Sequence, residues 1–140
     1  MFKLFTINQA NEILPEVKKK FKEVLSYKEQ VLSIQEQIQQ VPDSNNFFKK
    51  FLEKKQELNK MVSLLYKSIE ELEDMGVMIK SVDEGLLDFP SIKSKQEIWL
   101  CWKFGEEEVG FWHGKDEGFT GRKPIPQNGF EIFDDLSDLR

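Results

Sequence analysis

GLLDFPSIKSKQEIWLCWKFGEEEVGFWHGKDEGFTGR, residues 85–122, is the stretch that decides how the chain is organised. It holds all three tryptophans, the only cysteine, the only histidine and one of the two arginines. Every glycine of the chain lies at or beyond Gly76. This change in composition predicts a helical front part, residues 1–76, followed by a smaller part built of strands and loops, and therefore an α+β fold.

The strands are predicted from alternation. Within Glu97–Phe104, apolar side chains alternate with others, so a strand with two different faces is expected. One face would hold Ile98, Leu100, Trp102 and Phe104, and the other would hold Glu97, Trp99, Cys101 and Lys103. Further strands at Val77–Val82 and Val109–His113 would complete a small antiparallel sheet of about three strands. The polar run Ser91–Gln96 is interpreted as a break, and residues 114–125 as an irregular glycine-rich segment.

The first helix is predicted from its cap and its apolar stripe. Thr6 is a good N-cap, and Gln9 sits at the matching position of a capping box. Pro15 comes too late to be a first-turn proline, so we expect it to kink the helix rather than to divide it. Beyond it, apolar residues recur at spacings of three and four as far as Ile38, which predicts one long amphipathic helix.

The second helix has the most regular pattern of the chain. Its stripe is interrupted only by Lys55 and consists of Phe48, Phe51, Leu58, Val62, Leu65, Ile69 and Leu72. Such spacing is typical of a coiled-coil seam, and Gly76 is expected to end the helix. The short turn at residues 41–46 forces an antiparallel two-helix hairpin. A hairpin leaves part of each stripe uncovered, so the rest would be covered either by the second part of the chain or by a second copy of the hairpin in a homodimer or higher homo-oligomer.

Composition limits the class of protein. The 140 residues suffice for a single domain, made of the helical hairpin (1–76), a β cap with its loop (77–125) and an acidic tail (126–140). The net charge of −5 falls on residues 77–140, because the front part carries as many lysines as acids. An acidic, aromatic-rich part argues against a nucleic-acid partner. A single cysteine and the lack of a long apolar run indicate a cytoplasmic protein without membrane spans.

Four pieces of sequence resemble a known family: FTINQANEILPEV, GLLDFP, LCWKFGE, and FWH followed by GF-x-GR. Together they are similar to small prokaryotic proteins of the domain of unknown function 2203 family, from Phe5 to about Pro124. The resemblance implies a long helical hairpin, a smaller β-containing part and no established activity. The family's characteristic residues would be Gly85, Asp88, Phe89, Pro90, Cys101, Trp102, Gly105, Glu106, Trp112, His113, Gly118, Phe119, Gly121 and Arg122.

Three polar residues are the main candidates for a site. His113 is the only side chain of the type that titrates near neutral pH, so it is either a general acid or base or a structural histidine at a strand end. Asp88 would cap neighbouring amides or hold a partner such as His113 or Arg122. Arg122, one of only two arginines, would clamp a carboxylate or phosphate, or pin its loop to Asp88, Asp116 or Glu117.

The aromatic and sulfur side chains have simpler interpretations. Trp102 and Trp112 would line a ligand pocket or form the core of the sheet, and the alternation turns Trp102 inward. Trp99 is the tryptophan expected at a surface, and Cys101 is interpreted as a packed thiol rather than a nucleophile. One histidine and one cysteine predict no zinc site, and no nucleotide-binding motif indicates a cofactor.

No motif specifies a reaction, so the function stays a choice among hypotheses. The favoured one is a cytoplasmic binding or scaffolding module. Its β cap would present Arg122, His113 and Asp88 around a pocket for a small anion or for the acidic peptide of a protein partner. One alternative is an enzyme that uses His113 as general acid or base, oriented by Asp88. The other is a purely structural helical oligomer.

Overall fold

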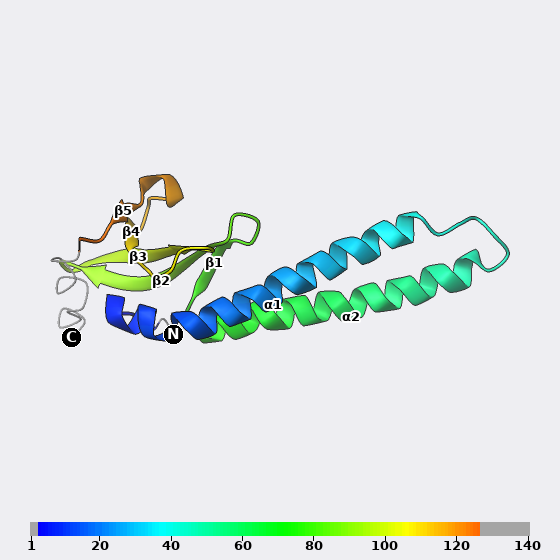
Figure 1. The fold of residues 1–140 in the computed structure, drawn as a ribbon, viewed down its shortest axis with the longest axis horizontal. Helices are drawn as coiled ribbons and strands as arrows, with labels where there is room; N and C mark the ends of the chain where they lie inside the picture. Colours follow the sequence, from blue (N-terminus) through cyan, green and yellow to red (C-terminus); the bar gives the residue numbers. More distant parts are fainter. Residues whose placement is uncertain (1–2, 127–140) are drawn as a thin grey trace. The chain divides into compact units, whose positions relative to one another are not determined.

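The computed structural model describes residues 3–126, and it consists of a helical hairpin followed by an antiparallel sheet (Figure 1). The helices are α1 (Ile7–Gln39) and α2 (Phe47–Asp74). The strands lie in chain order: β1 (Met78–Ser81), β2 (Leu86–Lys93), β3 (Gln96–Lys103), β4 (Phe111–Gly114) and β5 (Lys123–Pro124), with the 3₁₀ helix η1 (Phe119–Gly121) before the last. The expected α+β architecture is confirmed, but the sheet has five strands rather than three.

The chain divides into two compact units. One unit is residues 19–71, which form the part of the hairpin that includes its loop. The other comprises residues 1–18 and 72–140, of which the structure describes 3–18 and 72–126. The acidic tail was predicted at residues 126–140. All of it except residue 126 lies outside the described residues. Within residues 3–126, no helix combines the length and apolar character needed to cross a membrane.

Local hydrogen bonds set the start of α1. The hydroxyl of Thr6 accepts from the amide of Gln9 at 3.0 Å, and the side-chain oxygen of Gln9 accepts from the amide of Thr6 at 3.0 Å. These two bonds form the predicted capping box and satisfy two amides that a helix start leaves without partners. α1 then continues through Pro15 as one helix, so the proline does not divide it.

Gly76 ends α2 with a left-handed residue at φ +90°. Its amide donates to the carbonyl of Glu73 at 2.9 Å, and the next amide, of Val77, donates to the carbonyl of Leu72 at 3.3 Å. This bond pair is the Schellman motif, which satisfies the last carbonyls of a helix and redirects the chain. The predicted stop at Gly76 is therefore confirmed.

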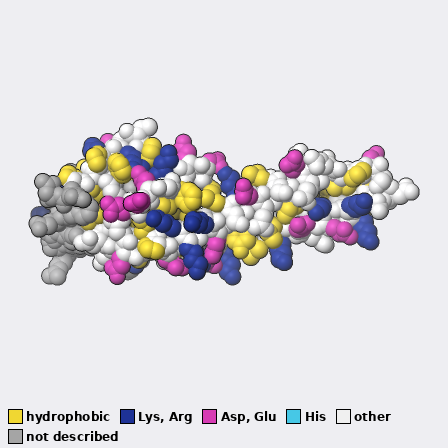
Figure 2. Space-filling view, viewed as in Figure 1, with side chains coloured by type: hydrophobic (Ala, Val, Ile, Leu, Met, Phe, Trp, Pro, Cys, Tyr) yellow, Lys and Arg dark blue, Asp and Glu magenta, His cyan; other side chains and the backbone are white. Residues whose placement is uncertain are grey.

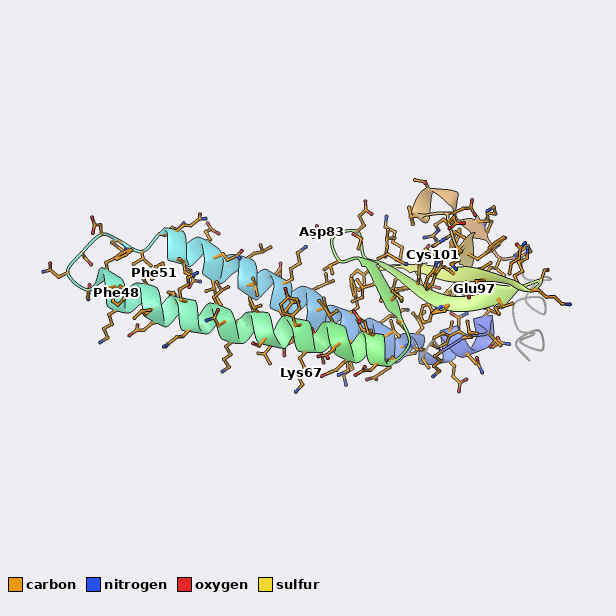
Figure 3. All side chains as sticks on the ribbon, turned by 180° about the vertical axis from the view of Figure 1, so that it is seen from behind. Phe48, Phe51, Lys67, Asp83, Glu97 and Cys101 are labelled. Carbon is orange, nitrogen blue, oxygen red and sulfur yellow. The ribbon has the colours of Figure 1, made fainter. Side chains whose placement is uncertain are left out.

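The hairpin unit buries mainly one of its two helices. Four residues of α1 are buried within residues 19–39: Phe21, Val24, Val31 and Ile34. From residue 47 to residue 71, by contrast, Ser68 is the one buried position of α2. Large apolar side chains are exposed here: Leu32 at 53%, Phe48 at 68%, Leu52 at 43% and Tyr66 at 66%. Figure 2 shows apolar side chains at the surface along the hairpin, and Figure 3 labels Phe48 on α2.

β2 is the strand that the sequence analysis missed. It pairs with β3 from Leu86↔Lys103 to Lys93↔Gln96, so the supposed polar break is the tip of a hairpin. The two tip residues, Ser94 and Lys95, have φ values of 50° and 66°. A two-residue turn with both values positive usually contains asparagine or glycine, and Ser-Lys does not signal it. β5 was missed as well, because it is only two residues long and lies within the predicted loop.

The start of the chain packs on one face of the sheet. The amide of Phe5 donates to the carbonyl of Pro90 at 2.8 Å, and the hydroxyl of Ser91 donates to the carbonyl of Phe5 at 2.6 Å. The rings of Phe5 and Phe89 meet edge to face at 5.3 Å. Trp102 is fully buried on this core face, as the alternation predicted. The core on this side includes Phe5, Ile7, Ala10, Leu14, Leu87, Phe89, Ile98, Leu100 and Trp102.

We predict that Gly76→Ala destabilises the protein by about 1–2 kcal/mol, because a side chain is strained in the left-handed region. A Cβ at this position would also lie 3.0 Å from Cβ of Lys3 and 3.1 Å from the ring of Phe5. Urea denaturation measures the loss. Gly110→Ala is the matched control, since a Cβ added there would meet no atom of another part of the described residues 3–126 within 4 Å. Equal stability of the two variants would contradict the assignment of Gly76 as a required helix stop.

Candidate functional site

The face of the sheet opposite the core face carries the candidate site, and we call it the site face. The register between β2 and β3 sets Asp88 opposite Cys101, and that between β3 and β4 sets Trp99 opposite His113. Side chains alternate along each strand, so these four lie on the same face. The sequence analysis placed Trp99 and Cys101 on one face of the strand and Trp102 on the other, and the register confirms this.

Asp88 and His113 form a buried pair at the centre of the site face. Nε2 of His113 lies 3.0 Å from Oδ2 of Asp88, and the side chains are 4% and 2% exposed. Nδ1 of His113 lies 2.9 Å from the carbonyl oxygen of Gly114. A carbonyl oxygen only accepts, so Nδ1 carries a proton. Unless another electrophile lies between Nε2 and the carboxyl group, a further proton joins them. The pair is then neutral as a whole, whichever partner holds that proton.

Burial controls the acid–base properties of the groups around this pair. Burial raises the pKa of Asp88 above its ordinary value, and the attraction of His113 offsets part of that rise. Burial also raises the pKa of the Cys101 thiol to about 12, with a contribution from the carboxylate of Asp88. Without a bound ion, a thiol with this pKa stays protonated at neutral pH and donates to Asp88. Its partner is the carboxylate and not the imidazole, so Cys101 is not arranged as an activated nucleophile.

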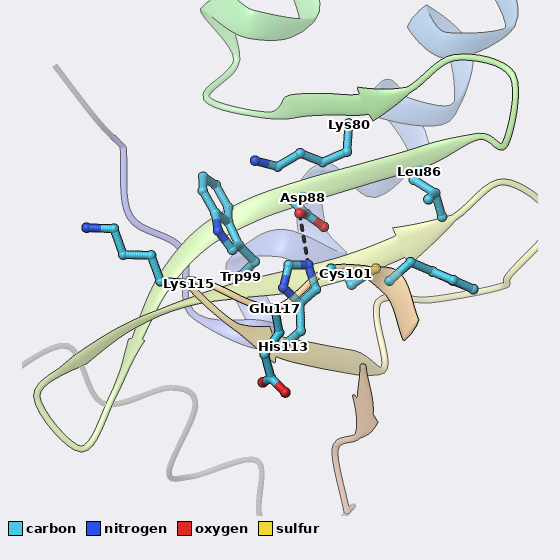
Figure 4. Close-up of a pocket in the computed structure, with 10 residues that line it drawn as sticks. Lys80, Leu86, Asp88, Trp99, Cys101, His113, Lys115 and Glu117 are labelled. Carbon is cyan, nitrogen blue, oxygen red and sulfur yellow. Dashed lines mark hydrogen bonds and ion pairs between the residues drawn. The ribbon is translucent and has the colours of Figure 1, made fainter. Parts of the chain in front are cut away.

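A cavity of about 140 Å³ adjoins the pair. Its wall combines acidic, basic, aromatic and thiol groups, and six of the residues that line it are Lys80, Asp88, Trp99, Cys101, His113 and Lys115. Figure 4 shows the Asp88–His113 hydrogen bond among these side chains. A second cavity of about 360 Å³ is larger but mostly apolar, and neither Asp88 nor His113 lines it. The buried Asp88–His113 pair therefore favours the smaller cavity as the site.

Two lysines give the cavity wall positive charge. Nζ of Lys80 lies 4.1 Å from the centre of the Trp99 ring, within the range of a cation–π contact. Nζ of Lys115 lies 2.9 Å from a carboxylate oxygen of Glu97, in an ion pair whose members are both well exposed. Exposed pairs of this kind are weak, so Lys115 can turn toward another anion at little cost.

A family model described as "Uncharacterized conserved protein (DUF2203)" matches residues 3–125. The chain belongs to the DUF2203 family. The match spans both helices and the whole sheet, and it contains every residue of the cavity wall. The resemblance noted from GLLDFP and the later motifs is thereby confirmed. No curated protein and no solved structure matches this DUF2203 chain, so these comparisons supply no activity.

Arg122 is held in this DUF2203 protein by contacts within the chain. Its guanidinium forms an ion pair with Glu106, and its side chain is 10% exposed. The same group stacks on the rings of Phe111 at 3.6 Å and Phe119 at 4.8 Å. Nη1 lies 3.9 Å from the sulfur of Cys101, so Arg122 borders the site face. Its carboxylate partner is Glu106, which the sequence analysis did not consider.

Trp102 and Trp112 do not line the cavity at the Asp88–His113 pair. The indole N–H of Trp102 donates to the carbonyl of Glu106 at 3.0 Å from within the core. Nζ of Lys93 lies 4.4 Å and Nζ of Lys123 lies 4.7 Å from the centre of the Trp112 ring. The tryptophan at the cavity is Trp99 instead.

The sequence analysis named Asp88 and His113 as candidates, but it did not join Cys101 or the lysines of the cavity wall to them. Asp88, Cys101 and His113 each offer a donor atom to the same point, and these atoms all lie within 4.8 Å of one another. The alternation did place Trp99 and Cys101 on one face. The sequence analysis did not predict β2, the strand that pairs with β3. Without β2, it could not place Asp88 opposite Cys101. The lysines of the wall had no sequence signal, because they resemble ordinary exposed lysines.

We predict that Arg122→Ala lowers the free energy of unfolding by about 1–2 kcal/mol, because it removes a charged hydrogen bond and two ring contacts. Urea denaturation of the purified protein measures the change. Lys123→Ala is the matched control: its ion pair with Glu117 is 49% and 44% exposed, so about 0.5 kcal/mol or less is expected. If Arg122→Ala were as stable as the control, the guanidinium would not be needed for the fold and a role in ligand binding would gain support.

Proposed function

We propose that this DUF2203 protein is a binding module whose cavity on the site face takes a small anionic group, such as a carboxylate or a phosphate. The observation that carries the proposal is the cavity itself, with a buried Asp88–His113 pair in its wall beside two lysines. We further propose that the module works in the cytoplasm, where its single thiol stays reduced.

Size and charge support an anionic group of few atoms. The cavity of about 140 Å³ is smaller than the roughly 300–1,000 Å³ typical of pockets for larger ligands. The Asp88–His113 pair contributes no net charge. Glu117, also in the wall, accepts from the amide of Gly114 at 2.9 Å and from Lys123 at 3.0 Å. These contacts hold the pKa of Glu117 below its ordinary value and compensate its charge, which leaves the lysines to attract an anion.

The enzymatic alternative has one observation for it and one against it. Asp88 is within hydrogen-bond reach of His113 and could orient the ring, as the hypothesis of an acid–base catalyst requires. However, both ring nitrogens are occupied, one by Asp88 and the other by the carbonyl of Gly114. A general acid or base needs a nitrogen that faces its substrate. Binding is therefore the function that this geometry supports better.

We predict that inorganic phosphate shifts the indole N–H resonance of Trp99 in a saturable manner and leaves that of Trp102 in place. The tryptophans report separately, because Trp99 lines the cavity and Trp102 is buried on the core face. Lys80→Gln and Lys115→Gln should each weaken binding by about two- to fivefold, since a partly exposed charge contributes up to about 1 kcal/mol. NMR titration in buffer with a chelator gives the affinities.

The control for these variants is Lys93→Gln. Lys93 stacks on Trp112 at 4.4 Å much as Lys80 stacks on Trp99 at 4.1 Å, but its partner ring does not line the cavity. Its phosphate affinity should equal that of the wild type. The anion site would be disproved if all three indoles shifted together, or if the cavity lysines behaved like Lys93.

We also propose that the hairpin self-associates, since a stripe on α2 lies exposed. Phe48, Leu52 and Tyr66 are separated by 4 and 14 residues, which is close to one and four turns, so they lie along one side of the helix. A second copy of the hairpin would cover this stripe and complete a four-helix bundle. The equal numbers of lysines and acids in residues 1–76 mean that two copies would not repel each other through net charge.

We predict a concentration-dependent dimer that the double change Phe48→Ser and Tyr66→Ser weakens at least about tenfold, through lost burial of two aromatic side chains. Sedimentation velocity over a range of protein concentrations measures the dissociation constant. Glu53→Ser combined with Lys67→Ser changes exposed residues on another side of α2 and should leave the dimer unchanged. A wild-type protein that stays monomeric at all concentrations would refute self-association.

A further inference from the structure

Three donor atoms of different kinds converge on the site face. They are a carboxylate oxygen of Asp88 from β2, the sulfur of Cys101 from β3 and a ring nitrogen of His113 from β4. All three side chains are buried, with residue exposures of 1%, 1% and 3%. Neighbouring strands of one sheet fix their positions, and a cavity wall gives access to the point where they meet. A metal-binding site needs donor atoms of suitable kinds, held by rigid elements and reachable from solvent. The three side chains meet these requirements.

The orientation of the histidine ring supplies a second argument. The carbonyl of Gly114 accepts from Nδ1 at 2.9 Å, which in a neutral imidazole leaves the lone pair on Nε2. Nε2 points at Oδ2 of Asp88 from 3.0 Å, so two lone pairs face each other unless an electrophile lies between them. That electrophile is either a proton or a metal ion. Metal-binding histidines regularly donate their other N–H to a backbone carbonyl, as His113 does.

We propose that Asp88, Cys101 and His113 bind a single zinc-like transition-metal ion, with its fourth coordination position open to the cavity. Zinc bonds of about 2.0–2.3 Å place tetrahedral ligand atoms about 3.5 Å apart. The donor atoms here span 3.0 Å for the Asp88–His113 pair and at most 4.8 Å for the set, so small side-chain rotations bring them to that spacing. The site would hold its ion whether or not the cavity also takes an anion.

The donor set selects the kind of metal. Thiolate and imidazole favour zinc and other late first-row transition metals, whereas magnesium and calcium prefer oxygen donors alone. Three protein ligands with one open position are typical of zinc sites that bind water or an exogenous ligand, while structural sites use four protein ligands. The expectation of no zinc site rested on the number of cysteines and histidines, and it left out the carboxylate that the fold brings to the same point.

The competing explanation is a hydrogen-bonded trio without metal, in which a proton joins His113 to Asp88 and the thiol donates to the same carboxylate. The two explanations differ in measurable ways. A metal site binds one ion per chain, places sulfur in the coordination shell and becomes more stable as the ion is added. The hydrogen-bonded trio would bind no ion, so adding the metal would neither bring sulfur into a coordination shell nor stabilise the protein.

The test uses the full chain after treatment with a chelator, in buffer without phosphate. Zinc is titrated in competition with a chromophoric chelator, and Co²⁺ is added as a spectroscopic probe. We expect one ion per chain, a rise in melting temperature with zinc but not with magnesium, and the near-ultraviolet absorption of a cobalt–thiolate bond. Failure to bind zinc at one per chain, or a cobalt spectrum without the thiolate absorption, would overturn the proposal.

Variants locate the site. Cys101→Ser should abolish the cobalt–thiolate absorption, and Asp88→Asn and His113→Gln should weaken zinc binding at least tenfold. Asp116→Asn removes an exposed carboxylate outside the donor set and should bind zinc like the wild type. Circular dichroism checks that each variant folds. If Asp88→Asn or His113→Gln unfolds, the test of the metal site rests on Cys101→Ser, which is the smallest change in structure. Unchanged zinc affinity in folded Asp88→Asn and His113→Gln would place the ion elsewhere. Phosphate binding is measured separately, so its failure leaves this result intact.

Discussion

The pairing of β2 with β3 is the interaction on which the rest of the sheet unit depends. It joins Leu86–Lys93 to Gln96–Lys103 in one unbroken antiparallel register. The register sets Leu87 opposite Trp102 on the core face and Asp88 opposite Cys101 on the site face. A shift by one residue would exchange the two faces and bury the carboxylate in the apolar core. Core packing therefore fixes the position of the polar site as well.

The two faces use the same strands for opposite purposes. On the core face, large apolar side chains pack against the start of the chain, and Phe5 and Ser91 join the first segment to β2. That packing stabilises the sheet through burial of apolar area. On the site face, the same rigid backbone holds Asp88, Cys101 and His113 together, and burial there raises the pKa of Asp88 and of Cys101. The stability of one face thus maintains groups on the other that would not come together by themselves.

The local features of the chain could be predicted, because short-range interactions produce them. Thr6 and Gln9 form their capping box, Gly76 ends α2, and the two faces of β3 follow from alternation along one strand. Ser94 and Lys95 show where this reasoning ends. Their positive φ values are imposed by the pairing of the flanking strands and not by their own preferences, so the end of β2 was interpreted as a break. Missing β2 also meant missing the juxtaposition of Asp88 with Cys101.

By itself, the sequence determined a helical hairpin followed by a small sheet, and it placed the unusual side chains in the second part. It could do so because helix periodicity, caps and strand alternation act over a few residues. Only the tertiary structure decided which of those side chains meet. His113 joins Asp88, whereas Arg122 pairs with Glu106 and stacks on Phe111. The partner of each group depends on strand register across the sheet, and residues far apart along the chain carry no local signal of that register.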